Sequence, residues 1–164
     1  MLISVSRRTD IPAFYSKWFF NRIKEGYVLV RNPMNIHQIG KINLSPNVVD
    51  GIVFWTKNPA PLIPYLGELD KRGIHYYFQF TLNDYEAEGF EPNVPSLTER
   101  VETFKKLSSL IGKERVIWRF DPIIMTSQLL PRDILKKVWK VGNLIKGCTE
   151  KLVFSFVDVK SYRK

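Results

Sequence analysis

The chain alternates between short apolar runs and longer segments in which apolar side chains recur at helical spacing. The apolar runs occupy residues 2–6, 50–58, 74–82, 115–120 and 151–159, and they are rich in β-branched and aromatic residues. Runs of this length and composition are typical of strands. The pattern therefore predicts five main strands.

The segments 11–26, 59–73, 96–112 and 130–147 predict helices between these strands. In the third, Ser96 and Glu99 have the spacing of a capping box, and Gly112 is placed to end the helix; Gly26 and Gly147 are placed to end the first and the last. The three prolines of 59–73 must lie in its first turns, because later ones would break a helix.

The expected apolar stripes are Phe14, Trp18, Phe19 and Ile23; Val101, Phe104, Leu107 and Ile111; and Ile134, Leu135, Val138, Val141 and Ile145. The tryptophans Trp18, Trp55, Trp118 and Trp139 fall on such stripes or strands and are expected mainly in the core.

Residues 27–33 and 37–45 are two further β-type pieces with turn residues between them, which favours a small β-hairpin insertion. Alternation of strand and helix with short connections implies a parallel sheet with covering helices. No linker divides the chain, so 1–164 is expected to form a single domain.

Two architectures fit this alternation, a doubly wound open sheet and a (β/α) barrel. No strand is followed by GxGxxG, which disfavours the dinucleotide-binding form of the open sheet. A closed barrel needs about eight strands and usually more than about 200 residues. We therefore expect an α/β fold that is a partial TIM-type barrel, whose open sheet edge would expose apolar surface and favour a dimer or aggregation.

Polar residues follow every expected strand, and in a barrel all carboxyl ends of strands meet at the rim that carries the chemistry. Arg119 and Asp121 are two residues apart, so both face one side of an extended segment. They predict an anion clamp and a carboxylate at the substrate; the alternative is a salt bridge that locks the loop. Lys57 predicts an amine that binds phosphate or carboxylate or forms a Schiff base, the alternative being a surface lysine.

The remaining candidates carry similar alternatives. In the loop after the first strand, Arg8 and Asp10 are favoured for the site, although Asp10 or its neighbour Thr9 can instead cap the next helix. Asn58 is either a helix cap or a ligand contact, and Gln79 faces the barrel interior if its aromatic neighbours face the helices. The expected catalytic residues are Asp121, Lys57 and Asp10, and the expected binding residues are Arg8, Asn58, Gln79, Arg119, Ser155 and Asp158. No metal ligand is predicted.

Charge and cysteine content narrow the functional classes. Lys and Arg number 25 against 16 Asp and Glu, a net charge of +9, which favours anionic partners, either a small molecule or nucleic acid. No RNA-binding, zinc-finger or basic-heptad signature accompanies the charge. The single Cys148 excludes an internal disulfide and a multi-cysteine metal site built by this chain alone. The N-terminus meets charge after six residues, so neither secretion nor a membrane is expected and a cytoplasmic location fits best.

The segments SRRTDIPAFY, GYVLVRNP, VDGIVFWTKNPAP, YYFQFTL, ERVIWRFDPI and SFVD together resemble the bacterial domain-of-unknown-function family 1848. The resemblance implies a radical S-adenosylmethionine-like (β/α) barrel about twice this length, of which this chain matches the N-terminal part. It also implies a cysteine cluster near the C-terminus that would hold a [4Fe-4S] cluster and S-adenosylmethionine. Cys148 does not match such a ligand, so the cluster ligands are absent here and the chain alone is expected to be inactive.

Three functions follow, in order of preference. The first is the barrel portion of a radical S-adenosylmethionine-like enzyme. The second is a barrel enzyme in which the strand-end carboxylates Asp10, Asp121 and Asp158 perform acid–base or divalent-metal chemistry. The third is a basic module that binds nucleic acid without catalysis.

Overall fold

The structure of the protein is a computed structural model that describes residues 1–5, 9–32 and 34–157. Five strands form a parallel sheet, and all of the predicted main strands are confirmed: β1 (Leu2–Val5), β4 (Gly51–Thr56), β5 (Tyr76–Thr81), β6 (Val116–Ile123) and β7 (Leu152–Phe156). The expected hairpin is also confirmed, as the antiparallel pair β2 (Tyr27–Arg31) and β3 (Ile39–Asn43).

Helical segments join these strands: α1 (Ile11–Phe14), α2 (Ser16–Glu25), η1 (Ile63–Tyr65), α3 (Leu66–Lys71), α4 (Leu97–Ile111), η2 (Lys113–Arg115) and α5 (Pro131–Leu144). The first predicted helix is interrupted at Tyr15, whose φ of −131° is not helical. The helix expected over 59–73 is shorter than predicted: its three prolines precede the α-helix α3, which begins only at Leu66 and ends at Lys71. Gly26 ends α2 in the left-handed conformation with φ 76°.

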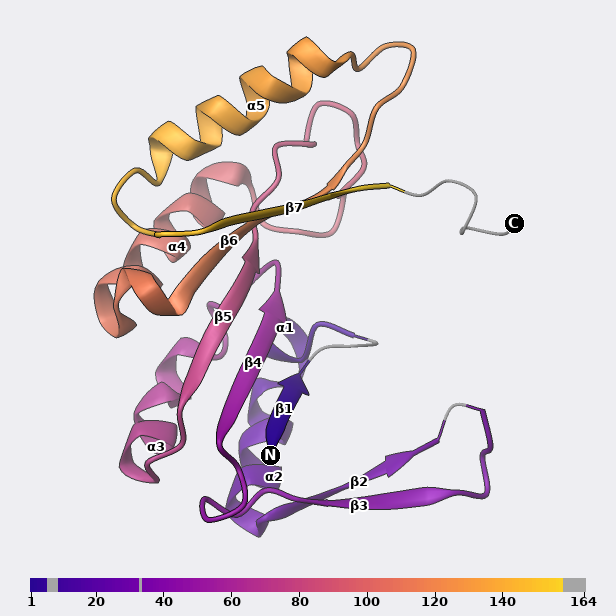
Figure 1. The fold of residues 1–164 in the computed structure, drawn as a ribbon, viewed down its shortest axis with the longest axis vertical. Helices are drawn as coiled ribbons and strands as arrows, with labels where there is room; N and C mark the ends of the chain where they lie inside the picture. The colour runs from indigo at the N-terminus through magenta and orange to yellow at the C-terminus, as the bar shows by residue number, and fades with distance from the viewer. Residues whose placement is uncertain (6–8, 33, 158–164) are drawn as a thin grey trace.

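The strands lie in the order β1, β4, β5, β6, β7, which follows the chain without reversal (Figure 1). A doubly wound sheet reverses its order, so this alternative is wrong. When parallel strands follow one another in chain order and every β–α–β connection is right-handed, all of the connecting helices lie on one face of the sheet. Among the described residues the outer edges of β1 and β7 have no neighbouring strand, so the sheet is open and no closed barrel forms.

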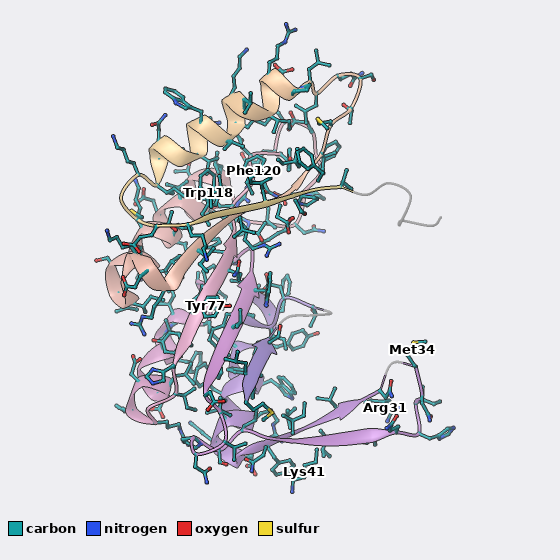
Figure 2. The ribbon with its side chains drawn as sticks, viewed as in Figure 1. Arg31, Met34, Lys41, Tyr77, Trp118 and Phe120 are labelled. Atoms are coloured by element: carbon teal, nitrogen blue, oxygen red, sulfur yellow. The ribbon has the colours of Figure 1, made fainter. Side chains whose placement is uncertain are left out.

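The helix-covered face of the sheet carries the core. Its central positions are the alternate residues Ile52 and Phe54 of β4, Tyr76, Phe78 and Phe80 of β5, and Val116, Trp118 and Phe120 of β6, all of them buried. Phe54 meets Phe19 of α2 edge to face, with ring centroids 5.5 Å apart, and Phe80 stacks on Phe104 of α4 at 5.1 Å. Trp118 and Phe120 lie between the sheet and α5 (Figure 2).

Among the described residues, no helix covers the opposite face of the sheet. Trp55, Tyr77, Ile117 and Arg119 alternate with the core residues and are only partly buried. The hairpin β2–β3 projects from one end of the sheet, with Met34 at its far tip (Figure 2). Its base joins the core through the partly buried Val28 and Ile42.

For four residues the prediction of a core position is wrong. Phe14, Trp18, Leu135 and Trp139 are 69%, 45%, 68% and 74% exposed. The break at Tyr15 takes Phe14 out of the stripe that continues through Phe19 and Ile23. The buried residues of α5 are Ile134 and Val141, which lie on one face of the helix. Leu135 is the next residue after Ile134 and therefore lies on a different face. Within the parts of the chain that the structure describes, no helix has the length and apolarity needed to cross a membrane.

The capping box of α4 makes the first prediction. Ser96 Oγ accepts a hydrogen bond from Glu99 N at 3.3 Å, and Ser96 N donates to Glu99 Oε2 at 2.9 Å. Replacing Ser96 by Ala should lower the free energy of unfolding by about 0.5–2 kcal/mol in urea denaturation. Ser109→Ala on the exposed face of the same helix should change it by less than about 0.5 kcal/mol, and equal effects at both sites would contradict the capping role.

Candidate functional site

The carboxyl ends of β4 to β7 lie at one edge of the sheet and carry a continuous polar network. Its members are Lys57 after β4, Asn83 after β5, Arg119 and Asp121 in β6, and Ser155 in β7. The predicted convergence of strand-end residues follows from parallel strands in chain order. Arg119 is paired in register with Thr81 on one side and Val153 on the other, so it lies in the middle of this edge.

At the carboxyl end of β6, the Asp121 carboxylate accepts hydrogen bonds from two neighbouring side chains. One carboxylate oxygen accepts a hydrogen bond from Arg119 Nη2 and the other accepts one from Ser155 Oγ. Burial raises the pKa of the Asp121 carboxyl, but the hydrogen bonds from Ser155 and Arg119 and the positive charges of Arg119 and Lys57 outweigh it and leave the pKa below its ordinary value. Asp121 is therefore an anion at neutral pH, which suits it to hold a cation or a hydroxyl better than to donate a proton.

Arg119 is held by two different contacts. Besides its pairing with Asp121, its guanidinium lies 4.5 Å from the centre of the Trp55 ring, a cation–π contact. Trp55 is on β4, so the Arg119 side chain crosses the intervening β5 on the uncovered face of the sheet. The salt bridge that was the alternative for this pair is confirmed, but it lies within β6, which continues to Ile123, and does not lock a loop.

Lys57 connects the β4 end to the loop 83–95. Its Nζ pairs with Glu91 Oε1, and its charge also acts on Asp121, so the amine lies near two carboxylates. The Lys57 side chain is 37% exposed whereas that of Glu91 is 5% exposed. Lys57 and Ser155 are therefore the members of the network that are accessible from solvent.

Asn83, Glu91 and Arg100 belong to the site and were missed from the sequence. Asn83 Nδ2 donates to Asp121 O at 3.1 Å and to Glu91 Oε1 at 3.3 Å, and its Oδ1 accepts from Asp121 N at 3.0 Å. Arg100 of α4 pairs with Glu91 Oε2 at 3.4 Å and is 1% exposed. Asn83 directly follows a strand, so the rule that selected Lys57 applies to it as well; Glu91 and Arg100 have no such signal.

Asp10 serves a structural purpose. Its Oδ1 accepts from Ala13 N at 3.0 Å as the N-cap of α1, which confirms the capping alternative. Its Oδ2 accepts from Thr56 Oγ1 at 2.9 Å and from Lys57 N at 2.8 Å. Asp10 thus joins the start of α1 to the end of β4, and its catalytic role stays a prediction.

Asn58 makes a local turn, because its Oδ1 accepts from Ala60 N at 3.2 Å while its own N donates to Thr56 Oγ1 at 2.9 Å. The helix-cap alternative for Asn58 is wrong, because the next helical segment, η1, begins only at Ile63 with Leu62 as its N-cap. Arg8 and Asp158, the other two predicted binding residues, lie outside the described residues.

Gln79 lies one row below the network on the uncovered face. It is 9% exposed, and its Cα is paired in register with that of Trp55. Gln79 Oε1 and Trp55 Nε1 are both buried and have no hydrogen-bond partner among the described residues. Buried polar atoms without a hydrogen-bond partner are uncommon in a folded protein and are places where a ligand group can be bound.

A family model described as "Domain of unknown function (DUF1848)" matches residues 2–164. The chain belongs to this family. Neither the curated proteins nor the solved structures contain a significant match. The resemblance of the quoted motifs is thus confirmed over essentially the whole DUF1848 chain.

The DUF1848 chain does not offer the ligands of an iron–sulfur cluster. Its single cysteine, Cys148, follows α5, beside Thr149, whose Oγ1 donates to Val116 O at 2.6 Å at the start of β6. Cys148 therefore lies at the amino end of the strands, opposite the polar network. In the described part of the chain no group of three or more His, Cys, Asp or Glu residues is arranged to hold a metal ion.

The lowered pKa of Asp121 predicts a pH-dependent stability. Because the folded pKa lies below the unfolded value of about 3.9, ionised Asp121 stabilises the protein at neutral pH, and this contribution is lost as the pH falls below about 4. Asp121→Asn should lower the free energy of unfolding by about 1–3 kcal/mol near neutral pH, and the difference from wild type should shrink in acid. Chemical denaturation across pH measures this.

The control for that measurement is Glu102→Gln, at a surface carboxylate that is 67% exposed. It should change the stability by less than about 0.5 kcal/mol at every pH. A difference between wild type and Asp121→Asn that grew in acid would contradict the assignment.

The buried Glu91 makes a second prediction at this site. Glu91→Ala leaves Arg100, at 1% exposure, without its closest anion, and should lower the free energy of unfolding by about 3–5 kcal/mol. Glu150→Ala, at an ion pair with Lys113 in which both side chains are more than half exposed, should cost less than about 1 kcal/mol. Thermal melts of both variants compare them directly, and similar melting temperatures would be inconsistent with the role of Glu91.

Proposed function

We propose that this chain is the ligand-binding part of a partial (β/α)-barrel enzyme, and that an anionic small molecule binds at the strand-end network. The observation that carries the proposal is the joining of four consecutive strand ends into one set of hydrogen-bonded and charged side chains. In folds built from consecutive β/α units, this edge of the sheet is where ligands bind.

The accessible charge favours an anion. Lys57 is the exposed cation of the network, and its partner Glu91 is already shared with Arg100 and Asn83, so a phosphate or carboxylate can bind Lys57 while Glu91 keeps two partners. Asp121 adds a fixed negative charge for an amine or a hydroxyl on the same ligand. A molecule that carries an anionic group for Lys57, together with an amine or a hydroxyl group for Asp121, would match these two residues.

S-adenosylmethionine, the cofactor that the family resemblance implies, has groups of these kinds. Its carboxylate would be held by Lys57, its amine by Asp121, and a donor of its adenine edge would satisfy the buried Gln79 Oε1. When bound, it would supply carbon groups activated by the sulfonium. The [4Fe-4S] cluster does not fit the residues of this chain, so no step of the proposal involves it.

The two other candidate functions have less support. In the carboxylate-dependent enzyme, Asp10 would have to act although both of its oxygens accept hydrogen bonds that join α1 to β4. A nucleic-acid module would use the net charge of +9, but the polar network is a mixed cluster of cations and carboxylates, and phosphate backbones bind best to cations alone.

Titration calorimetry with two probes, S-adenosylmethionine and inorganic pyrophosphate, tests the proposal. Lys57→Met should weaken both probes by about tenfold or more, because it removes the accessible cation. Gln79→Leu should weaken S-adenosylmethionine alone, because pyrophosphate has no donor for the amide oxygen. Lys113→Met, at the opposite edge of the sheet, should change neither affinity.

Each result has a defined meaning. Binding of pyrophosphate that depends on Lys57, with no binding of S-adenosylmethionine, would retain the anion site and remove the adenosyl ligand. If neither probe binds the wild-type chain, or if Lys57→Met binds both as well as wild type does, the proposed site is wrong.

A further inference from the structure

A cavity of about 440 Å³ lies between α5 and the helix-facing side of β7. Its walls are apolar and include Met125, Leu135, Val138, Leu152, Phe154 and Phe156. The three β7 residues alternate along the strand, and Phe154 is paired in register with the buried Phe120, so they face the helical layer. We call this surface the α5–β7 groove.

The groove exposes more large apolar side chain than a free surface usually does. Leu135 is 68% exposed, Phe154 54% and Phe156 61%, and Trp139 continues the apolar surface on α5 at 74%. Contiguous apolar patches of this kind mark interaction sites in soluble proteins. The adjoining edge of β7 has no strand beside it within the described residues, so backbone groups are open on the same side.

We propose that the α5–β7 groove binds an amphipathic helix of a partner polypeptide, with an apolar stripe against β7 and acidic side chains on its flanks. A helix is the matching element because helices cover the same face of the sheet over β4, β5 and β6, with Phe19 of α2 on Phe54 and Phe104 of α4 on Phe80, while β7 keeps its apolar side chains exposed. Figure 1 shows α5 at one end of the sheet, with β7 extending beyond it.

The charge around the groove selects an acidic partner. From residue 131 to residue 157 there are six Lys or Arg and two Asp or Glu. Lys137 and Lys140 are neutralised by Glu88 and Asp84 of the loop 83–95. Arg132 is 76% exposed and lies 4.0 Å from Asp133, Lys136 is exposed on α5, and Lys146 and Lys151 flank the start of β7. A second copy of the chain would bring these like charges together, so self-association is disfavoured.

The test uses a stapled helical peptide of about 15 residues with leucines at i, i+3, i+4 and i+7 and glutamates on both flanks. The control peptide carries lysines in place of the glutamates. Fluorescence anisotropy of the labelled peptides should show that the wild-type chain binds the acidic peptide at least about tenfold more tightly than the basic one.

Three kinds of variant locate the binding. Leu135→Asp and Phe156→Asp should each weaken the acidic peptide by about tenfold or more, whereas Ile36→Asp, an equally exposed apolar residue in the distant hairpin, should not. The double variant Arg132→Glu with Lys136→Glu should weaken the acidic peptide and strengthen the basic one. All of these positions are exposed, and circular dichroism checks that the fold is retained.

The proposal is overturned by any of three results. These are no binding of the acidic peptide, equal binding of the two peptides, and binding that is insensitive to Phe156→Asp. A concentration-dependent dimer in sedimentation that Phe156→Asp dissociates would instead identify a second copy as the occupant. None of these results depends on the ligand of the strand-end network, so the two proposals fail independently.

Discussion

Parallel strands joined by right-handed crossovers place every connecting helix on the same face of a sheet when the strand order does not reverse. In this protein the order β1, β4, β5, β6, β7 follows the chain, and both main features of the structure derive from it. The alternate residues of each strand divide into a helix-covered core face and an uncovered face. All carboxyl ends also lie at one edge, where polar side chains from separate strands come within hydrogen-bonding distance.

The strand-end network keeps charge at that edge by pairing its buried ions, although Arg100 Nη2 is buried without a hydrogen bond and lies 3.9 Å from Glu86 Oε1. Glu91 and Arg100 are almost completely buried, and each is compensated, Glu91 by Lys57, Arg100 and Asn83, and Arg100 by Glu91 and the Pro95 carbonyl. Because unpaired buried charges are costly, these pairs hold the loop 83–95 against the sheet although it contains no regular secondary structure. Tyr85 adds to this by donating to Pro122 O at 3.0 Å and accepting from Ile124 N at 3.1 Å.

The same geometry explains why the two ends of the sheet differ. Where α2 and α4 cover β4 and β5, aromatic side chains of helix and strand pack together and are buried. At β7 the equivalent side chains are exposed, and α5 contributes Leu135 and Trp139 to the same surface. One apolar surface is thus covered within the described chain, and the other is exposed.

Much of the fold was predictable because its signals are local. The capping box of Ser96 and Glu99, the terminal Gly26 and the apolar runs of the strands each depend on residues close in sequence. The helix-capping role of Asp10 is of the same kind, since Ala13 is three residues away. The predictions of Leu135 and Trp139 as core residues were wrong because periodicity shows which residues share a helix face but not how wide the contact with that face will be.

The site residues also fall into those that local sequence signals predict and those that only the folded chain brings together. The sequence by itself determined the strand-end position of Lys57, Arg119 and Asp121, since the run before each one predicts a strand. Tertiary structure alone decided that Glu91 and Arg100 join them, because the carboxylate comes from a loop without periodicity and its partner from a helix. It also decided that Gln79 Oε1 and Trp55 Nε1, on residues paired in register, are buried without a hydrogen-bond partner among the described residues. A hydrogen bond or an ion pair between residues far apart in the chain depends on distances that exist only after the chain has folded.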